Sequence, residues 1–170
     1  EINIGDWSSD VCSSDLLAMV VERHGKNGNI GYGFLTGSCL KKGTVATTYF
    51  HDHHNLFVAG SSPDDMLFAV NRIRELQGGF LTVKDGRILS ELALPVCGLL
   101  SEKSIRENGL ALKAVRKSLT DLGYVHNNPI MSVATLGLPV SPALKLTDKG
   151  LVDVKKGEIV PLIVNTKKNK

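Results

Sequence analysis

A helix with clear start and stop signals is the feature that most restricts how this chain can fold. Residues 63–77 carry apolar side chains at three- and four-residue steps, the spacing of one face of an α-helix. Ser62 stands where an N-cap belongs and Pro63 takes the first helical position. Two glycines, Gly78 and Gly79, follow the last apolar step. The pattern therefore predicts a helix over residues 63–77.

A hairpin follows this helix almost at once. Asp85 and Gly86 separate two alternating runs, residues 80–84 and 87–92. Asp-Gly in such a setting is a strong short-range signal for a β-hairpin, because both residues accept a positive φ. A helix directly beside a hairpin favours a fold in which helices and an antiparallel sheet are mixed.

The remaining elements extend the same pattern. Strands are predicted at residues 17–23, 43–50, 55–60, 151–154 and 159–164. A second helix is predicted at residues 104–122, with a buried side formed by Leu112, Val115, Leu119 and Leu122. Residues 129–142 contain three prolines and are predicted to be irregular. The sequence thus predicts an α+β fold: a mixed, mainly antiparallel β-sheet with about two helices packed on one face.

The first sixteen residues are set apart from this domain. Residues 7–16 show neither helical nor strand periodicity, and they resemble the translation of a sequencing-library adapter joined to a reading frame at about Leu17. Residues 1–16 are therefore treated as a non-native segment. Residues 17–165 form the predicted domain, and residues 166–170 are predicted to be a disordered basic tail.

Composition excludes several classes of protein. With 170 residues, the chain has room for one domain or for a fragment of something larger. Three cysteines, an odd number, argue against a disulfide scaffold and for reduced thiols in the cytoplasm. Cys39 and Cys97 sit among apolar neighbours and are expected to be buried and inert. No apolar run approaches the roughly 18 residues of a membrane span, and the nine aromatic residues do not interleave with basic ones as in nucleic-acid binders.

A histidine-rich segment interrupts the predicted strands. Residues 51–55 place three imidazoles and one carboxylate between two apolar runs. Continuous strand pairing would bury at least two ionisable groups, which is costly unless they have partners. A bulge or a junction between strands avoids that cost, so a hydrogen-bonded polar junction is favoured. His51 and His53 also have a plausible metal spacing, which keeps a metal site open as an alternative.

A second polar group follows the first predicted strand. Glu22, Arg23 and His24 lead into a glycine-rich stretch that ends with Gly31 and Gly33. The glycine spacing is one residue too long for a dinucleotide-binding fingerprint, and no helix begins there to receive a phosphate. Tight turns that use glycine for positive φ are the favoured interpretation.

These motifs, taken in order, resemble the C-terminal part of the bacterial and archaeal adenine deaminases. The resemblance rests on residues 22–31 and 51–55, on Asp64-Asp65-Met66, on Gly78-Gly79, and on runs near residues 94–99, 138–140 and 144–151. It covers residues from about 17 to about 162. It implies a metal-dependent amidohydrolase of purine salvage, which converts adenine and water to hypoxanthine and ammonia.

The same resemblance implies that most of the enzyme lies outside this chain. Family members hold a divalent metal, manganese or iron, in a (β/α)8 barrel, which needs about 250 residues. No metal is therefore expected in this chain, and the chain alone is expected to be inactive. The missing barrel, adenine and further copies of the enzyme are the expected partners, with no nucleic acid and no membrane.

The two polar groups are the expected site. Substrate-binding or interdomain roles are assigned to eight residues: Glu22, Arg23, His24, Asn29, His51, Asp52, His54 and Asn55. His53 departs from the family pattern, which has a small polar residue there. Two alternatives remain open: a self-contained module that binds a transition metal through His51 and His53, and a purely structural or oligomerisation role.

Overall fold

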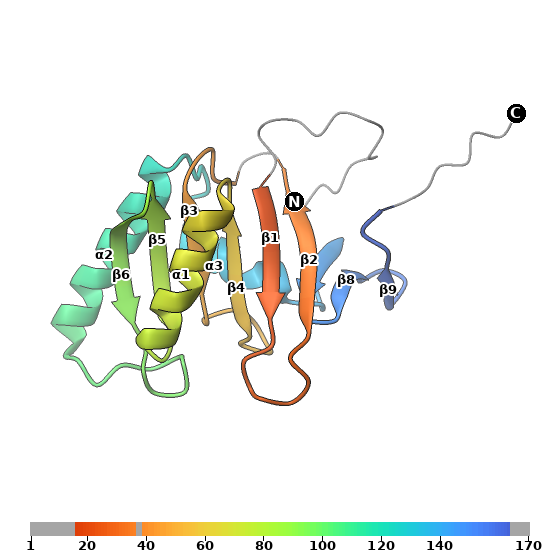
Figure 1. Cartoon of the computed structure of the whole chain (residues 1–170), viewed down its shortest axis with the longest axis horizontal. Coiled ribbons are helices and arrows are strands. Elements are labelled where there is room, and N and C mark those ends of the chain that lie inside the picture. The colour runs from red at the N-terminus through yellow and green to blue at the C-terminus, as the bar shows by residue number, and fades with distance from the viewer. Residues whose placement is uncertain (1–15, 37–38, 164–170) are drawn as a thin grey trace, which may run out of the picture.

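An antiparallel sheet of six strands forms the body of the protein in a computed structural model that describes residues 16–36 and 39–163. The strands are β1 (Leu16–Val21), β2 (Ile30–Leu35), β3 (Thr44–Thr47), β4 (Leu56–Gly60), β5 (Gly79–Lys84) and β6 (Arg87–Ala93). They lie in the order β2-β1-β4-β3-β5-β6, and every neighbouring pair is antiparallel (Figure 1). The α+β class and the mainly antiparallel sheet are confirmed. Residues 1–15 of the predicted non-native segment and the predicted tail lie outside the described residues.

Two helices cover opposite faces of this sheet. Helix α1 (Pro63–Glu75) joins β4 to β5 across β3 and packs on the face that carries Ala46, Val58 and Leu81. Helix α2 (Ile105–Asp121) packs on the other face, which Figure 1 shows behind the sheet. The prediction that both helices share one face is therefore wrong.

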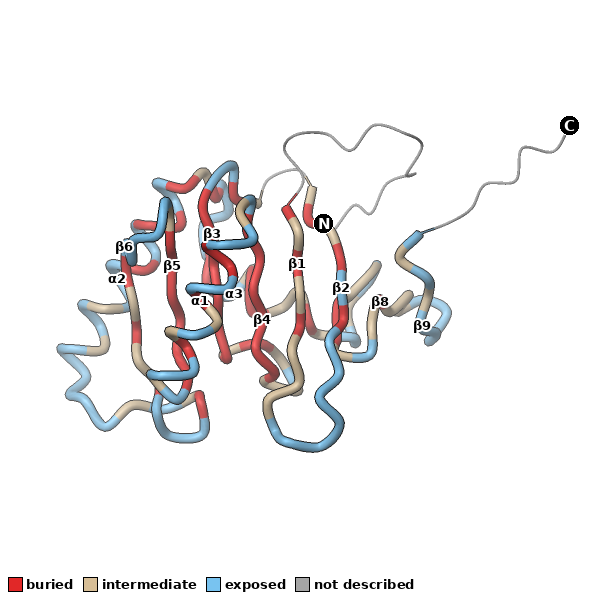
Figure 2. Tube along the Cα trace, in the orientation of Figure 1, coloured by how far each residue is buried: buried red, intermediate tan, exposed pale blue. Residues whose placement is uncertain are grey.

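The physical reason is the composition of the central strands. All residues of β3 and β4 are buried, so both faces of the sheet need a cover (Figure 2). On the α2 face, Val45, Phe57 and Phe80 form one cluster with the helix. An apolar run without alternation is typical of a strand buried on both sides.

Both predicted helices begin as their sequences indicate. The Ser62 side chain accepts a hydrogen bond from the backbone N–H of Asp65, and Pro63 follows it. In α2, Ser104 and Glu107 form a capping box. One predicted core residue of α2 differs: Leu112 is 38% exposed, because the first half of the helix lies against an open groove.

The sequence predicted two strands of a second, smaller sheet and missed the third, β7 (Leu144–Thr147). This sheet contains β7, β8 (Gly150–Asp153) and β9 (Glu158–Val160), and β2 packs against it. Gly31 and Gly33 lie inside β2 rather than in a turn. A Cβ on Gly31 would lie only 1.8 Å from the carbonyl oxygen of Thr147, so these glycines permit close approach of the two sheets. The positive-φ interpretation is wrong for both and holds for Gly25 and Gly28.

The region between α2 and β7 is more regular than predicted. Helix α3 (Pro129–Ala134) and a short 3-10 helix, η1 (Thr135–Gly137), occupy it. Asn128 caps α3 and Pro129 takes its first position, so the proline begins the helix instead of breaking it. None of the helices in the described part of the chain is long and apolar enough to cross a membrane.

The two described cysteines differ in exposure. Cys39 packs against the core, and burial raises the pKa of its thiol to about 11. This agrees with an inert thiol. Cys97 is exposed, so the prediction of burial is wrong there. It lies in a turn with φ of 57°, which turns its side chain out of the apolar run.

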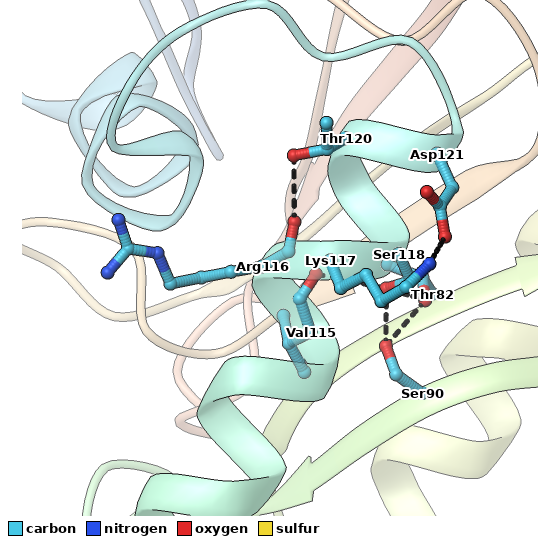
Figure 3. Close-up of polar contacts among 8 residues, drawn as sticks. All are labelled: Thr82, Ser90, Val115, Arg116, Lys117, Ser118, Thr120 and Asp121. Atoms are coloured by element: carbon cyan, nitrogen blue, oxygen red, sulfur yellow. Dashed lines mark hydrogen bonds and ion pairs between the residues drawn. The ribbon is translucent and has the colours of Figure 1, made fainter.

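Three buried hydroxyl groups tie α2 to the β5–β6 hairpin (Figure 3). Oγ1 of Thr82 lies 2.8 Å from Oγ of both Ser90 and Ser118, and the two serine oxygens are 2.6 Å apart. Ser118 also donates to the carbonyl of Val115, at 2.9 Å. The contacts fix the position of α2 on the sheet.

Candidate functional site

The two predicted polar groups lie at the same end of the strands of the large sheet. The loops there, which carry residues 22–29 and 51–55, are called the loop edge below. Val21, the last residue of β1, pairs with Leu56, the first residue of β4. The loop after β1 and the loop between β3 and β4 therefore leave the sheet side by side, at the lower edge in Figure 1. Residues 51–54 lie in the second of these loops, so no continuous strand runs through the histidines.

Hydrogen bonds join the two loops directly. The backbone N–H of Arg23 donates to the side-chain oxygen of Asn55 at 3.4 Å, and its Nε donates to the carbonyl of His54 at 2.6 Å. Nε2 of His24 lies 2.9 Å from the carbonyl oxygen of His53. Residues separated by about thirty positions in the sequence thus form one site.

Arg23 also reaches a third segment. Its Nη2 donates to the carbonyl of Cys97 at 2.7 Å, and Gly98 lies so close that a Cβ there would be 2.6 Å from Nη2. Thr48 completes the junction, because its hydroxyl donates to the carbonyl of Gly98 and accepts from the N–H of Gly79. Partial burial lowers the pKa of the Arg23 guanidinium from its ordinary value, but the group stays charged. Arg23 is therefore a residue that positions loops.

Glu22 shapes the loop after β1. Its carboxylate accepts hydrogen bonds from the backbone N–H groups of His24, Lys26, Asn27 and Gly28. Desolvation acts to raise the pKa of Glu22, but these donors outweigh it and lower the pKa. The N–H of Glu22 in turn donates to the carbonyl of Asn29 at 2.9 Å, so both predicted residues serve the loop itself.

The histidine rings pack on aromatic neighbours. Tyr49, His51 and His54 form a group, with ring centroids 4.8 Å apart for Tyr49 and His51 and 5.4 Å apart for the two histidines. His53 packs on the other side, 5.4 Å from the Phe50 ring, which stacks on Phe57 in the core. The His53 ring thus packs toward the core, whereas the rings of His51 and His54 lie with Tyr49 nearer the surface of the loop.

Two buried ring nitrogens of this segment have no hydrogen-bond partner among the residues that the structure describes. They are Nε2 of His53 and Nδ1 of His54. Burial lowers the pKa of both histidines, and the neighbouring His51 and Arg23 lower that of His54 further. His54 also has a φ of 50°, which is unusual for a residue other than glycine. Unsatisfied groups and unusual backbone are features found at functional sites.

Asp52 is the most accessible acid of the site. Its side chain is 75% exposed, and one carboxylate oxygen lies 3.7 Å from Nδ1 of His51, whose side chain is 22% exposed. Neither group is used to hold the loops together. His51 and Asp52 are therefore the pair whose side chains remain available to a ligand or to another protein surface.

A metal site does not form from these residues. No group of three or more His, Cys, Asp and Glu side chains converges among residues 16–36 and 39–163. His51 faces Tyr49, whereas His53 faces Phe50, so the two predicted ligands belong to different environments. The residues present do not fit a divalent metal, and the alternative of a metal-binding module finds no support in the geometry.

Sequence reasoning missed three residues that complete the site. Thr48 and Gly98 connect the loops through hydrogen bonds, and Tyr49 packs on the histidine rings. The signal for Thr48 and Tyr49 was their place at the end of a β-rich run directly before the histidines. Nothing local indicates Gly98, because its role comes from residues far away in the sequence.

Comparison with known proteins identifies relatives of the whole described domain. The family model described as "Adenine deaminase C-terminal domain" matches residues 1–158. The adenine deaminase of Clostridium perfringens is 48% identical over 160 residues, which are 94% of this chain and 28% of that protein. Adenine deaminase 2 of Shouchella clausii is 50% identical over 89% of this chain and 26% of its own length. The adenine deaminase of Brucella abortus is 48% identical over 83% of this chain and 24% of its own length.

The chain spans about a quarter of the length of these curated relatives and matches only their C-terminal part. Because the family model covers nearly all of the chain, and because the relatives share about half of its residues, the resemblance seen in the polar motifs is confirmed. The chain belongs to the adenine deaminase C-terminal domain family.

Proposed function

We propose that this domain serves an enzyme that hydrolyses adenine to hypoxanthine and ammonia, and that its loop edge helps to enclose the active site of a separate catalytic barrel. The observation that supports this best is the merging of the two polar groups at one edge of the sheet, held by Arg23 and His24. A loop edge built from rigidly held polar residues is suited to face a substrate or another domain.

The residues that are present suggest which steps this domain and the catalytic barrel each contribute. A divalent metal, manganese or iron, would supply a hydroxide for attack on the purine when bound. Ligands for it are proposed in the catalytic barrel, because the described residues bring no three His, Cys, Asp or Glu side chains together. This domain contributes orientation and exclusion of water.

Individual roles follow from which groups are already occupied. Glu22 and Arg23 use their side-chain hydrogen bonds on the loops, and Asn29 accepts one through its backbone carbonyl, so these three act as positioning residues. His51 and Asp52 present side chains that no loop contact consumes, and they are the proposed contacts to adenine or to the barrel. A cytoplasmic location and a homo-oligomeric enzyme belong to the same proposal, the first in keeping with the free thiols of Cys39 and Cys97.

A chimera tests this proposal. The matched C-terminal part of the Clostridium perfringens adenine deaminase is replaced by this chain, and conversion of adenine is followed through ammonia release with manganese or iron supplied. We expect the chimera to be active and the isolated chain to be inactive. His51→Asn and Asp52→Asn should each lower kcat/KM by about tenfold, the loss of one hydrogen bond in a closed site. Asp121→Asn, on the outer side of α2, is the matched control and should change nothing.

Three results would contradict the proposal at different points. Ammonia release by the isolated chain would show that catalysis does not need the barrel. An inactive but folded chimera would refute the assignment of this chain to the enzyme. Unchanged kcat and KM in both His51→Asn and Asp52→Asn would remove the loop edge from the active site and support a purely structural role.

A further inference from the structure

A groove in two parts runs along α2, and one of its lining residues, Tyr49, also packs on the histidine rings described above. One part has a volume of about 390 Å³ and an apolar lining, with Tyr49, Leu94, Leu99, Leu112, Ile130 and Met131 among its residues. The other part has a volume of about 770 Å³ and lies between α2 and residues 123–129. Leu112 and Arg116 line both parts, so the two are continuous.

The second part is strongly basic. Lys41, Lys113, Arg116, Lys117 and His126 line it, and no aspartate or glutamate does. Lys117 is paired with Asp121 at 2.5 Å. Among residues 16–36 and 39–163, Lys41 and Lys113 form no ion pair, so at least two cations face the groove without a counter-charge.

Local contacts hold the basic side chains in place. Nη2 of Arg116 donates to the carbonyl of Asn127 at 3.1 Å, and Figure 3 shows the side chain extending away from the hydroxyl cluster. The backbone N–H of Lys41 donates to the carbonyl of Leu122 at the end of α2. Its stem lies across Gly123, where a Cβ would be 2.8 Å from the Lys41 Cγ. The groove is therefore shaped by the fold and does not depend on loosely placed surface lysines alone.

Apolar side chains that line the first part of the groove are exposed to solvent. Leu112 is 38% exposed and Met131 is 40% exposed, although both lie beside buried residues of the main core. Arg116 lines this opening and further cations line the basic part beside it, which disfavours pairing with a second copy of the same surface because like charges would meet. An occupant should combine an apolar part with negative charge.

We propose that this groove binds an organic anion of about the size of a nucleoside monophosphate. Its flat apolar part lies in the pocket of Leu112, Tyr49 and Met131, and its phosphate lies in the basic part near Lys41 and Lys113. A small molecule is favoured over a peptide because the two parts meet at only two residues, Leu112 and Arg116, and each part has the size of a ligand pocket. The inference is independent of the proposed role in adenine hydrolysis.

Calorimetric titration of the chain with three probes tests it. Adenosine monophosphate carries both parts of the proposed ligand, whereas adenosine and inorganic phosphate carry one each. We expect saturable binding of the monophosphate, at least about tenfold tighter than that of either half, and weaker binding as salt rises. Lys113→Gln should weaken the monophosphate at least about fivefold and leave adenosine unchanged, whereas Leu112→Ser should weaken both.

The controls separate this site from general charge effects. Lys156→Gln removes a lysine from the turn between β8 and β9 and should have no effect. Because Lys113 is exposed, its substitution should leave the thermal midpoint unchanged. Equal affinity for phosphate and monophosphate would overturn the proposal, as would equal losses in Lys113→Gln and Lys156→Gln. Binding of acidic peptides with no binding of the monophosphate would overturn it as well.

Discussion

The hydroxyl cluster of Thr82, Ser90 and Ser118 allows a sharp test of how α2 is held on the sheet. The three side chains are almost fully buried, with exposed fractions of 0%, 7% and 7%. Each hydroxyl has one proton, and Ser118 directs its proton to the carbonyl of Val115. The protons of Thr82 and Ser90 can therefore fill at most two of the three contacts between the hydroxyl oxygens at once.

Removal of one hydroxyl takes at least one hydrogen bond from the cluster. In Ser118→Ala, Thr82 and Ser90 can still make one hydrogen bond, but one buried proton loses its acceptor. A net hydrogen bond contributes about 1 kcal/mol, and a buried group left without a partner costs about 1–3 kcal/mol. We expect each single substitution, Thr82→Val, Ser90→Ala or Ser118→Ala, to lower the free energy of unfolding by about 1–2 kcal/mol.

The triple substitution should behave differently. With all three hydroxyls gone, no buried donor remains without an acceptor, and Thr82→Val keeps the side-chain volume. The three single effects should sum to about 3–6 kcal/mol, whereas the triple variant should lose only about 1–2 kcal/mol. Urea unfolding followed by far-ultraviolet circular dichroism measures all four variants. If the triple variant loses as much free energy of unfolding as the three single variants together, the three hydroxyls do not form a coupled unit.

Two further predictions concern the loop edge. Gly98→Ala should destabilise the domain more than Gly157→Ala in thermal unfolding, because both positions have positive φ but only a Cβ on Gly98 meets Arg23; equal shifts would contradict the close contact. The lowered pKa values of His53 and His54 mean that the unfolded chain binds more protons near pH 6, so stability should fall as the pH drops from about 7 to about 5. His53→Gln should reduce this dependence in urea titrations at each pH, and an unchanged slope would contradict the buried neutral ring.

Local signals were enough for the elements that the sequence marks at both ends. The helix after Ser62 and the hairpin at Asp85-Gly86 have caps and turns that depend only on neighbours in the sequence, and both formed as predicted. The strand β2 was missed because Gly31 and Gly33 suggest a turn, and only the second sheet explains them. The covering of both sheet faces was missed because it depends on where strands lie, which the alternation within one strand does not reveal.

The ionisable residues of the candidate site stand out in the sequence, but Thr48, Tyr49 and Gly98 and the roles of the members do not. The histidines and Arg23 stand out because polar groups interrupt apolar runs, and the pairing of Val21 with Leu56 brings them together. That register is a property of the whole sheet. Sequence patterns therefore found the polar residues but could not distinguish the side chains that hold the loops from those that face outward.

The contacts of Arg23 bear on how this domain would meet the proposed catalytic barrel. Its guanidinium joins the carbonyls of His54 and Cys97, and Thr48 joins Gly98 to the same junction, so three loops are fixed by groups within the domain itself. None of these bonds needs a residue from outside the chain. The loop edge is therefore preorganised within the domain itself, and the proposed closure over a substrate would be a movement of a rigid body rather than a folding event. Because preorganised surfaces lose little conformational entropy on association, His51 and Asp52 can make their contacts at small cost.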